Sequence, residues 1–209
     1  MAPHRLEGIM TTSPFPGAAS IHEAAGRIGA LPGRFRPVTP EMRAYGPAYP
    51  VRCPGGDNLW LHRAIAAAPP GSILVAETGG LTEFGYWGEI MTRAARARGL
   101  AGLVIDGGVR DTAALASLDF AVFSSGACIR GTGKDPARGG ALAVPVLLGD
   151  VLVRPGDLAV GDADGVVVVP ADAAGATVEA ARRRDLDETA IIARLEAGET
   201  TLGIYGLPA

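Results

Sequence analysis

The chain has 209 residues, of which 48% are apolar and 20% are charged, and its formal net charge is −3. A single domain of this length and composition buries a core without disulfides or a structural metal, which excludes intrinsic disorder and small disulfide-stapled scaffolds. The net negative charge argues against a nucleic-acid partner, because phosphate neutralisation needs a basic surface.

The first part of the chain predicts little regular structure. Residues 1–17 show no periodic pattern and are expected to form an N-terminal arm, followed by one domain over residues 18–209. A helix is predicted from Ser20, which can cap it, to Gly29. Proline and glycine are frequent from there on, so residues 44–51 are expected to form at best an irregular or edge strand.

From residue 57 onward short apolar runs alternate with helical patterns, which is typical of an α/β sheet with parallel strands. Helices are predicted over residues 57–68, 86–98 and 111–118, and buried strands over residues 72–76, 102–105 and 120–124. Three later strands, residues 143–148, 157–160 and 166–169, are separated only by turns, and Pro155-Gly156-Asp157 and Asp164-Gly165 are hairpin signals. A charged helix over residues 171–197 follows.

Cysteine and lysine content narrows the chemistry. Cys53 and Cys128 follow no secretory leader, and no apolar run reaches the roughly 18–20 residues of a membrane helix, so we expect a reduced cytoplasmic protein with no membrane partner. Lys134 is the only lysine and lies in a glycine-rich loop. Schiff-base aldolases and pyridoxal-phosphate enzymes need a buried lysine, so the sequence argues against both classes.

Two loops between residues 78 and 111 follow consecutive predicted strands, at the sheet edge where ligands of α/β proteins collect. The first loop is rich in glycine and runs into a helix that starts with Gly88, Glu89, Ile90 and Met91. Unpaired N–H groups at such a start can hold a carboxylate or phosphate, and Gly88 would let the ligand approach the backbone. The alternative is that these glycines only make a turn.

The second loop places Arg110 and Asp111 directly after an apolar strand. A hard divalent cation prefers oxygen ligands and a guanidinium pairs with carboxylates, so the two residues can neutralise a 2-oxo acid from two sides. The alternative is structural: Asp111 caps the following helix and Arg110 is a surface ion-pair partner.

Twenty residues separate Glu89 from the Arg110-Asp111 pair, and this signature resembles that of the divalent-metal-dependent pyruvate aldolases. These are the 4-hydroxy-4-methyl-2-oxoglutarate / 4-carboxy-4-hydroxy-2-oxoadipate aldolases, which are related to the regulator of ribonuclease E activity A (RraA). The resemblance extends to IHEAAGR from Ile21, PGGDNLWLHRAI from Pro54, GYWGE from Gly85, VRPGD from Val153 and DADGVVVVP from Asp162. It therefore spans nearly the whole chain from residue 18.

The resemblance implies a fold and an assembly. The fold would be an α/β, swivelling β/β/α-type sandwich, a single RraA-like domain with a C-terminal helix. Homotrimers or homohexamers would form, with active sites between subunits. By this resemblance Asp111 would be the one direct protein ligand of Mg²⁺ or Mn²⁺, Arg110 would face a substrate oxygen, and the amides of Glu89, Ile90 and Met91 would hold the carboxylate of pyruvate.

The implied reaction is retro-aldol cleavage of a 4-hydroxy-2-oxo acid to pyruvate and a second carbonyl compound. The metal would stabilise the enolate of pyruvate as a Lewis acid, Arg110 would add positive charge, and Glu89 would orient a water that returns a proton. Oxaloacetate decarboxylation through the same enolate is an expected side activity. The family usually has Asp where this chain has Glu89, and often an acid where this chain has Ala114.

Four further residues have two interpretations each. Asn58 either binds the substrate or a water of the metal, or lies near a helix cap, and His62 is expected to be packed rather than catalytic. Glu23 and Glu199 match acidic positions that the family contributes across the subunit interface, and otherwise they are solvated side chains.

Two other functions compete with the aldolase. The first is a non-catalytic regulator that binds a protein such as ribonuclease E, and the second is a related lyase or hydrolase acting on a biosynthetic intermediate. The GDN motif at Asn58 and the GYWGE motif at Gly85 resemble the aldolases more closely than the regulators. We therefore favour the aldolase with a small 2-oxo acid as its substrate.

Overall fold

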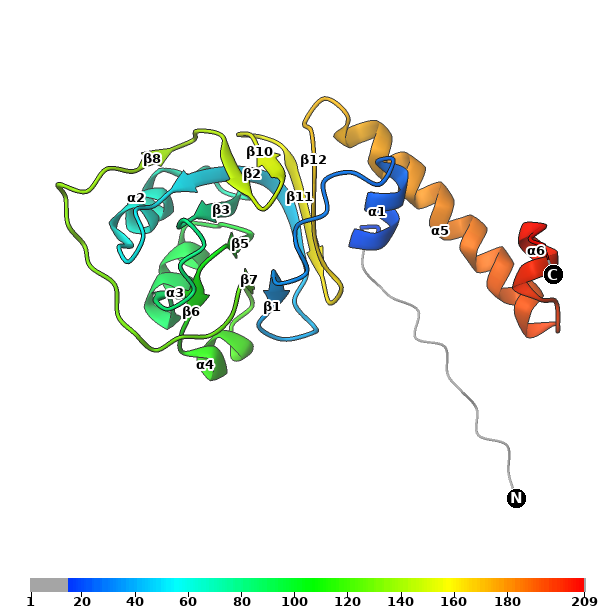
Figure 1. Ribbon diagram of the computed structural model, residues 1–209, viewed down its shortest axis with the longest axis horizontal. Coiled ribbons are helices and arrows are strands. Elements are labelled where there is room, and N and C mark those ends of the chain that lie inside the picture. The colour runs from blue at the N-terminus through cyan, green and yellow to red at the C-terminus, as the bar shows by residue number, and fades with distance from the viewer. Residues whose placement is uncertain (1–14, 209) are drawn as a thin grey trace, which may run out of the picture.

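The computed structural model describes residues 15–208, so residues 1–14 of the predicted N-terminal arm lie outside the described part. Its central feature is an eight-stranded sheet in the order β1-β7-β5-β3-β2-β11-β12, with β8 paired to β2 (Figure 1). The strands are β1 (Arg36–Pro37), β2 (Ala44–Arg52), β3 (Ile73–Glu77), β5 (Gly102–Ile105), β7 (Ala121–Ser124), β8 (Ala141–Leu142), β11 (Leu158–Asp162) and β12 (Gly165–Val169). The α/β fold predicted from the sequence is confirmed.

The parallel part of the sheet contains β2, β3, β5 and β7, as the alternation of strands and helices predicts. All residues of β5 and β7 are buried, which is the pattern expected of strands covered on both faces. The two ends of the strand order approach each other, since Arg36 Nη1 on β1 donates a 3.0 Å hydrogen bond to the Asp164 carbonyl beside β12. The sheet therefore curls into a nearly closed barrel.

Strand β2 is central, which corrects the prediction of an irregular or edge strand there. Its prolines are tolerated because β2 changes partners along its length: it pairs with β11 up to Pro47 and with β3 from Ala48 onward. Pro47 lies where one pairing ends. Pro50 lies opposite Val75 of β3, and its carbonyl accepts a 2.9 Å hydrogen bond from the N–H of Ala143.

The helices cover two sides of the sheet (Figure 1). Helices α2 (Leu59–Ala67), α3 (Glu89–Ala97) and α4 (Thr112–Ser117) gather at the parallel strands, whereas α1 (Ala18–Ala24) and α5 (Ala174–Glu196) lie beyond β11 and β12. Side chains of β12 alternate between two cores, because Val166 and Val168 join the main core while Val167 and Val169 pack with α1 and α5. This burial on both faces explains the unbroken valine run.

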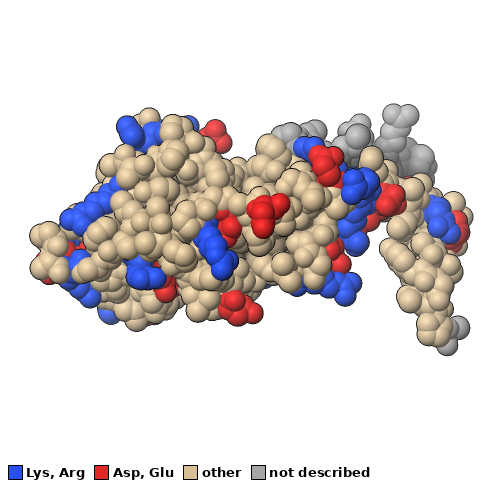
Figure 2. All heavy atoms as spheres, turned by 90° about the horizontal axis from the view of Figure 1, so that it is seen from above, with Lys and Arg blue, Asp and Glu red and all other residues tan. Residues whose placement is uncertain are grey.

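Helix α5 extends well past the sheet, and α6 (Thr201–Tyr205), which the sequence did not predict, folds at its end (Figure 1). The buried residues of α5 are Thr177, Val178 and Ala181, all near its start. No helix within residues 15–208 combines the length and apolarity needed to cross a membrane. On the face drawn in Figure 2, basic and acidic side chains are interspersed. The C-terminal end of the chain, with α6, projects from the rest of the molecule.

Several predicted boundaries need correction. The helix expected from residue 86 begins at Glu89, because Gly85–Trp87 forms strand β4, which pairs with β6 (Gly108–Val109). The strand predicted over residues 143–148 is shorter, β9 (Val146–Leu148), and it forms a hairpin with β10 (Val151–Val153), a strand that the sequence did not predict. Pro155-Gly156-Asp157 does not close a hairpin, since β10 and β11 belong to different sheets, whereas Asp164-Gly165 joins β11 to β12 as predicted.

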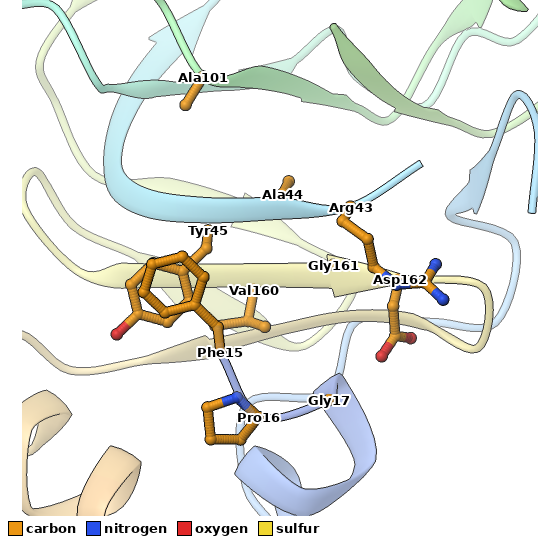
Figure 3. Close-up of a pocket in the computed structure, with 10 residues that line it drawn as sticks. All are labelled: Phe15, Pro16, Gly17, Arg43, Ala44, Tyr45, Ala101, Val160, Gly161 and Asp162. Carbon is orange, nitrogen blue, oxygen red and sulfur yellow. The ribbon is translucent and has the colours of Figure 1, made fainter. Parts of the chain in front are cut away.

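The start of the described chain packs on the sheet (Figure 3). The Phe15 ring stacks on Tyr45 of β2 with the ring centroids 3.8 Å apart. The Ala18 N–H donates a 2.7 Å hydrogen bond to Asp162 Oδ2 on β11, which ties the start of α1 to the sheet. Residues 15–17 of the predicted arm are therefore part of the packed structure.

Candidate active site

The two loops that follow the parallel strands meet at one small cavity of about 200 Å³. Its walls come from the start of α2, the β4–α3 connection, the β6–α4 connection and the loop before β8. The lining residues are Asn58, His62, Tyr86, Gly88, Ile90, Met91, Arg110, Asp111 and Lys134. The structure thus brings together most of the residues that the sequence selected, and it adds His62, Tyr86 and Lys134.

Asp111 faces the start of α3. Its backbone is left-handed (φ 57°), and its side chain makes no capping hydrogen bond to α4. Instead, Asp111 Oδ2 accepts a 3.0 Å hydrogen bond from the N–H of Glu89. The structure therefore does not support the alternative in which the Asp111 side chain caps the following helix.

Gly88 is required by close approach. A Cβ at this position would lie 2.3 Å from Asp111 Oδ2 and 3.1 Å from Arg110 Cγ, and its φ of −159° is ordinary extended backbone. The glycine therefore makes room for two functional side chains, rather than supplying a turn that only glycine can adopt.

Arg110 lies beside Asp111 with its guanidinium accessible. The Arg110 N–H donates a 2.8 Å hydrogen bond to the Trp87 carbonyl, which fixes its backbone against β4. Its Nε is 3.9 Å from Asp111 Oδ2, and 48% of the side chain is exposed, so most of the guanidinium donors remain available to a ligand.

The first turn of α3 points unpaired donors toward this pair. Helix geometry leaves the N–H groups of Ile90 and Met91 without an intrahelical acceptor, while the Glu89 N–H is taken by Asp111. The positive end of the helix dipole adds to their attraction for an anion. The Glu89 carboxylate itself pairs with Arg93 on the outer face of α3 at 2.8 Å and does not line the cavity.

Asn58 presents a buried acceptor. Only 5% of the residue is exposed, and its Nδ2 donates a 2.8 Å hydrogen bond to the Tyr86 carbonyl. Within the described residues its Oδ1 has no hydrogen-bond partner, although it is buried. A buried acceptor without a donor is rare in proteins and points to a missing ligand, water or cation. The side chain of Asp57, not that of Asn58, binds the start of α2, by accepting from the Leu59 N–H at 2.9 Å.

Lys134 lines the cavity, although the sequence did not indicate a role for it at this site. The buried Asp57 places it: Asp57 Oδ2 accepts a 2.7 Å hydrogen bond from the N–H of Asp135. The Gly133 carbonyl also accepts from the N–H of Asn58 at 3.1 Å. The sequence feature that could have indicated this placement is Asp57, the acidic residue of the GDN motif. A sequence pattern does not show, however, that Asp57 bonds to the loop that carries Lys134.

His62 shares this wall of the cavity with Lys134. Partial burial lowers the pKa of the His62 imidazole below its usual value, and the positive charge of Lys134 lowers it further. We therefore expect a neutral imidazole at neutral pH. His62 is partly buried, in line with the expectation of a packed side chain, but it also lines the cavity.

Glu23 and Glu199 do not reach this cavity within one chain. Glu23 on α1 pairs with Arg27 at 3.0 Å, and Glu199 after α5 pairs with Arg194 at 2.7 Å. The hydrogen bond from each arginine lowers the pKa of its glutamate carboxyl. Both residues lie on the side of the molecule that carries α1 and α5, away from α2 to α4 (Figure 1). Any role at this kind of site would require a neighbouring copy.

The donor set fits a hard divalent cation. Among residues 15–208, Asp111 is the only acidic residue that lines the cavity, and Asn58, whose buried Oδ1 has no partner there, belongs to the same wall. Within residues 15–208, no group of three or more His, Cys, Asp or Glu side chains is placed to hold a metal. Mg²⁺ commonly binds through one or two carboxylates and keeps several waters, so one carboxylate and one amide oxygen are compatible with it.

Comparisons with known proteins identify the family of this chain. A family model described as RraA-like, Aldolase/RraA, matches residues 18–168. A protein of Halalkalibacterium halodurans with the provisional name 4-hydroxy-4-methyl-2-oxoglutarate aldolase is 34% identical over 170 residues, which cover 81% of this chain and 80% of that protein.

Solved structures show the same fold. An uncharacterised protein from Pseudomonas syringae pv. tomato has a TM-score of 0.79 at 31% identity, covering 88% of this chain and 86% of that chain. The RNA-processing inhibitor RraA from Thermus thermophilis has a TM-score of 0.67 at 25% identity, covering 73% of this chain and 92% of that chain. The resemblance read from the sequence is thereby confirmed, and this chain belongs to the Aldolase/RraA family.

Proposed function

We propose that this chain is a divalent-metal-dependent lyase that cleaves a 4-hydroxy-2-oxo acid to pyruvate and a second carbonyl compound. The observation that carries the proposal is the meeting of the Asp111 carboxylate, the Arg110 guanidinium and the open first turn of α3 at one cavity. The name of the Halalkalibacterium halodurans relative supports the same reaction class.

Asp111 would hold the Mg²⁺ or Mn²⁺ ion, with the buried Asn58 Oδ1 facing the ion or one of its waters. When bound, the ion supplies Lewis-acid stabilisation of negative charge on the substrate. The N–H groups of Ile90 and Met91 bind the C1 carboxylate, and Gly88 leaves space for its approach. Their fixed direction orients the substrate before any bond breaks.

Arg110 stabilises the charge that develops during cleavage. The C3–C4 bond breaks, its electron pair forms the enolate of pyruvate, and the proton of the C4 hydroxyl leaves with a base. The Arg110 backbone is held by the Trp87 carbonyl, and its guanidinium lies beside Asp111 with donors available for the enolate oxygen. Protonation at C3 then releases pyruvate. Oxaloacetate decarboxylation would proceed through the same enolate.

Three glutamates are proposed to take part in the proton transfers. Glu89 would orient the water that returns a proton to C3, and this role requires its carboxylate to leave Arg93. Glu23 and Glu199 would act across the interface of a homotrimer or homohexamer, since neither lines the cavity of its own chain. Lys134 is placed to bind a second carboxylate on the departing half of the substrate.

The test is pyruvate release from 4-hydroxy-4-methyl-2-oxoglutarate, with Mg²⁺ and with a chelator. We expect turnover to need the metal and to be lost in Asp111→Ala, while Asp119→Ala, an exposed aspartate after α4, retains it. Unchanged turnover in Asp111→Ala would remove the proposal.

A second candidate is a regulator that binds a protein, favoured by the similarity to the RNA-processing inhibitor from Thermus thermophilis. Capture of purified ribonuclease E by the chain, together with no pyruvate from any 2-oxo acid, would favour this function over the lyase.

A further inference from the structure

A second cavity, of about 440 Å³, lies at the carboxyl end of β7, where the chain leaves the parallel part of the sheet. It shares no lining residue with the candidate active site, although Val109 and Thr112, the neighbours of Arg110 and Asp111, form part of its wall. The carboxyl edge of parallel strands is where α/β proteins commonly bind ligands.

Two arginines converge on this cavity. Arg34 and Arg36 both line it and both are exposed, and within residues 15–208 neither has a carboxylate within salt-bridge distance. The Arg34 guanidinium lies 5.0 Å from the Phe35 ring centroid. Arg36 uses Nη1 for the Asp164 carbonyl, which leaves most of its donors available.

The strand pairing explains why positive charge gathers there. Arg36 lies opposite Ser124 in the antiparallel pair of β1 and β7, so this arginine is held beside the end of β7. The contact of Arg36 with the Asp164 carbonyl anchors its exposed side chain at the barrel seam. The charge is therefore positioned by the fold.

Hydroxyl groups complete the polar wall. Ser125 lines the cavity, and its Oγ is buried and without a hydrogen-bond partner among the described residues. Its backbone is fixed, because the Ser125 N–H donates to the Gly107 carbonyl at 3.2 Å. Thr112 adds a second hydroxyl at the cavity wall. A buried hydroxyl without a partner is unfavourable unless something else bonds to it.

We propose that this cavity binds the phosphate group of a small phosphomonoester. Two guanidinium groups and the Thr112 hydroxyl supply enough donors for the three terminal oxygens of a phosphate dianion, and the buried Ser125 Oγ lies behind them. The volume leaves room for a few carbon atoms, and the apolar wall of Pro37, Val38 and Val109 would contact them. The proposal stands apart from the lyase activity, since no residue of the candidate active site takes part.

The probe is glycerol 3-phosphate, measured by titration calorimetry at low salt, with glycerol as the uncharged control. We expect saturable binding of one molecule per chain and no binding of glycerol. Arg34→Ala and Arg36→Ala should each weaken binding by roughly 10-fold to 100-fold, the usual range for lost charged hydrogen bonds. Ser125→Ala should weaken it less.

Control variants distinguish binding in this cavity from general charge attraction and from binding at the candidate active site. Arg96→Ala/Arg154→Ala removes two exposed arginines elsewhere and should bind as the wild type does, and Arg110→Ala should also bind normally. Because Arg36 also holds the barrel seam, Arg36→Lys and the thermal midpoint of each variant test whether lost binding reflects lost folding. Arg34→Ala leaves the seam untouched.

Four results would overturn the proposal. The first is the absence of saturable binding at millimolar glycerol 3-phosphate. The second is equal weakening in Arg34→Ala and in the control double variant, which indicates general charge attraction. The third is loss of binding in Arg110→Ala, which assigns the anion to the active site. The fourth is a change of molecular mass in Arg34→Ala by light scattering, which shows that a second copy fills the cavity.

Discussion

The N–H of Glu89 donates a 3.0 Å hydrogen bond to Asp111 Oδ2, so the two ends of the sequence signature touch each other. This bond ties the β6–α4 connection to the first turn of α3. The same carboxylate faces the cavity and holds the helix start, and changes at Asp111 must be designed to separate these two roles.

Asp111→Asn separates charge from shape. The asparagine oxygen can still accept from Glu89, so we expect the thermal midpoint to stay near that of the wild type. Metal-dependent pyruvate release should fall by roughly 100-fold or more, because the anionic oxygen that attracts a cation is gone. Initial rates at several Mg²⁺ concentrations measure this, and wild-type rates in Asp111→Asn would contradict a role for the charge.

Arg110→Lys keeps one positive charge but loses the planar guanidinium. We expect kcat to fall on the order of 10²–10³-fold, with a smaller change in KM, because the contact strengthens as negative charge develops. Since Arg110 makes its Trp87 contact through the backbone, folding should be unaffected. A rise in KM with unchanged kcat would instead assign Arg110 to substrate binding alone.

Gly88→Ala tests the close approach at the site. The new Cβ would lie 2.3 Å from Asp111 Oδ2, so Asp111 must move and activity should be lost. Gly175→Ala on α5 is the matched control, because nothing lies within 4 Å of its added Cβ, and helix propensity should stabilise that variant by about 0.5–1 kcal/mol. Full activity in Gly88→Ala would show that Asp111 needs no fixed position.

Asp57→Ala should loosen the loop that carries Lys134. The buried carboxylate accepts from Leu59 at 2.9 Å and from Asp135 at 2.7 Å, so its removal leaves two donors unpaired and should destabilise the protein by roughly 2–4 kcal/mol. Urea denaturation measures this loss. Lys134→Met should leave stability unchanged and raise KM for a substrate with two carboxylates. Equal KM values in Lys134→Met and the wild type would exclude that contact.

His62 predicts a pH dependence of stability. Its pKa is lowered in the folded protein by burial and by Lys134, so the unfolded chain binds this proton more readily. The contribution of neutral His62 to the free energy of unfolding is fully present above about pH 6.5, the pKa of this imidazole in the unfolded chain. It is lost as the pH falls through the lower pKa of the folded protein. Urea denaturation between pH 7.5 and 5.5 should show this decline in the wild type and a smaller one in His62→Asn. If stability changed equally with pH in the wild type and in His62→Asn, the decline could not be assigned to His62. Glu23 and Glu199 titrate at lower pH, outside this window.

The alternation of strands and helices, the family, and the neighbourhood of Gly88, Arg110 and Asp111 were all predictable from the sequence. These depend on hydrophobic periodicity and on short segments that follow strands, which are local features. Two other features depend on contacts between distant segments. Strand β2 is central because it pairs with β11 and with β3, and Asp57 holds the loop of Lys134, 77 residues away in the chain, at the cavity. Both outcomes depend on hydrogen bonds between distant segments, and a sequence pattern does not specify which distant groups will pair.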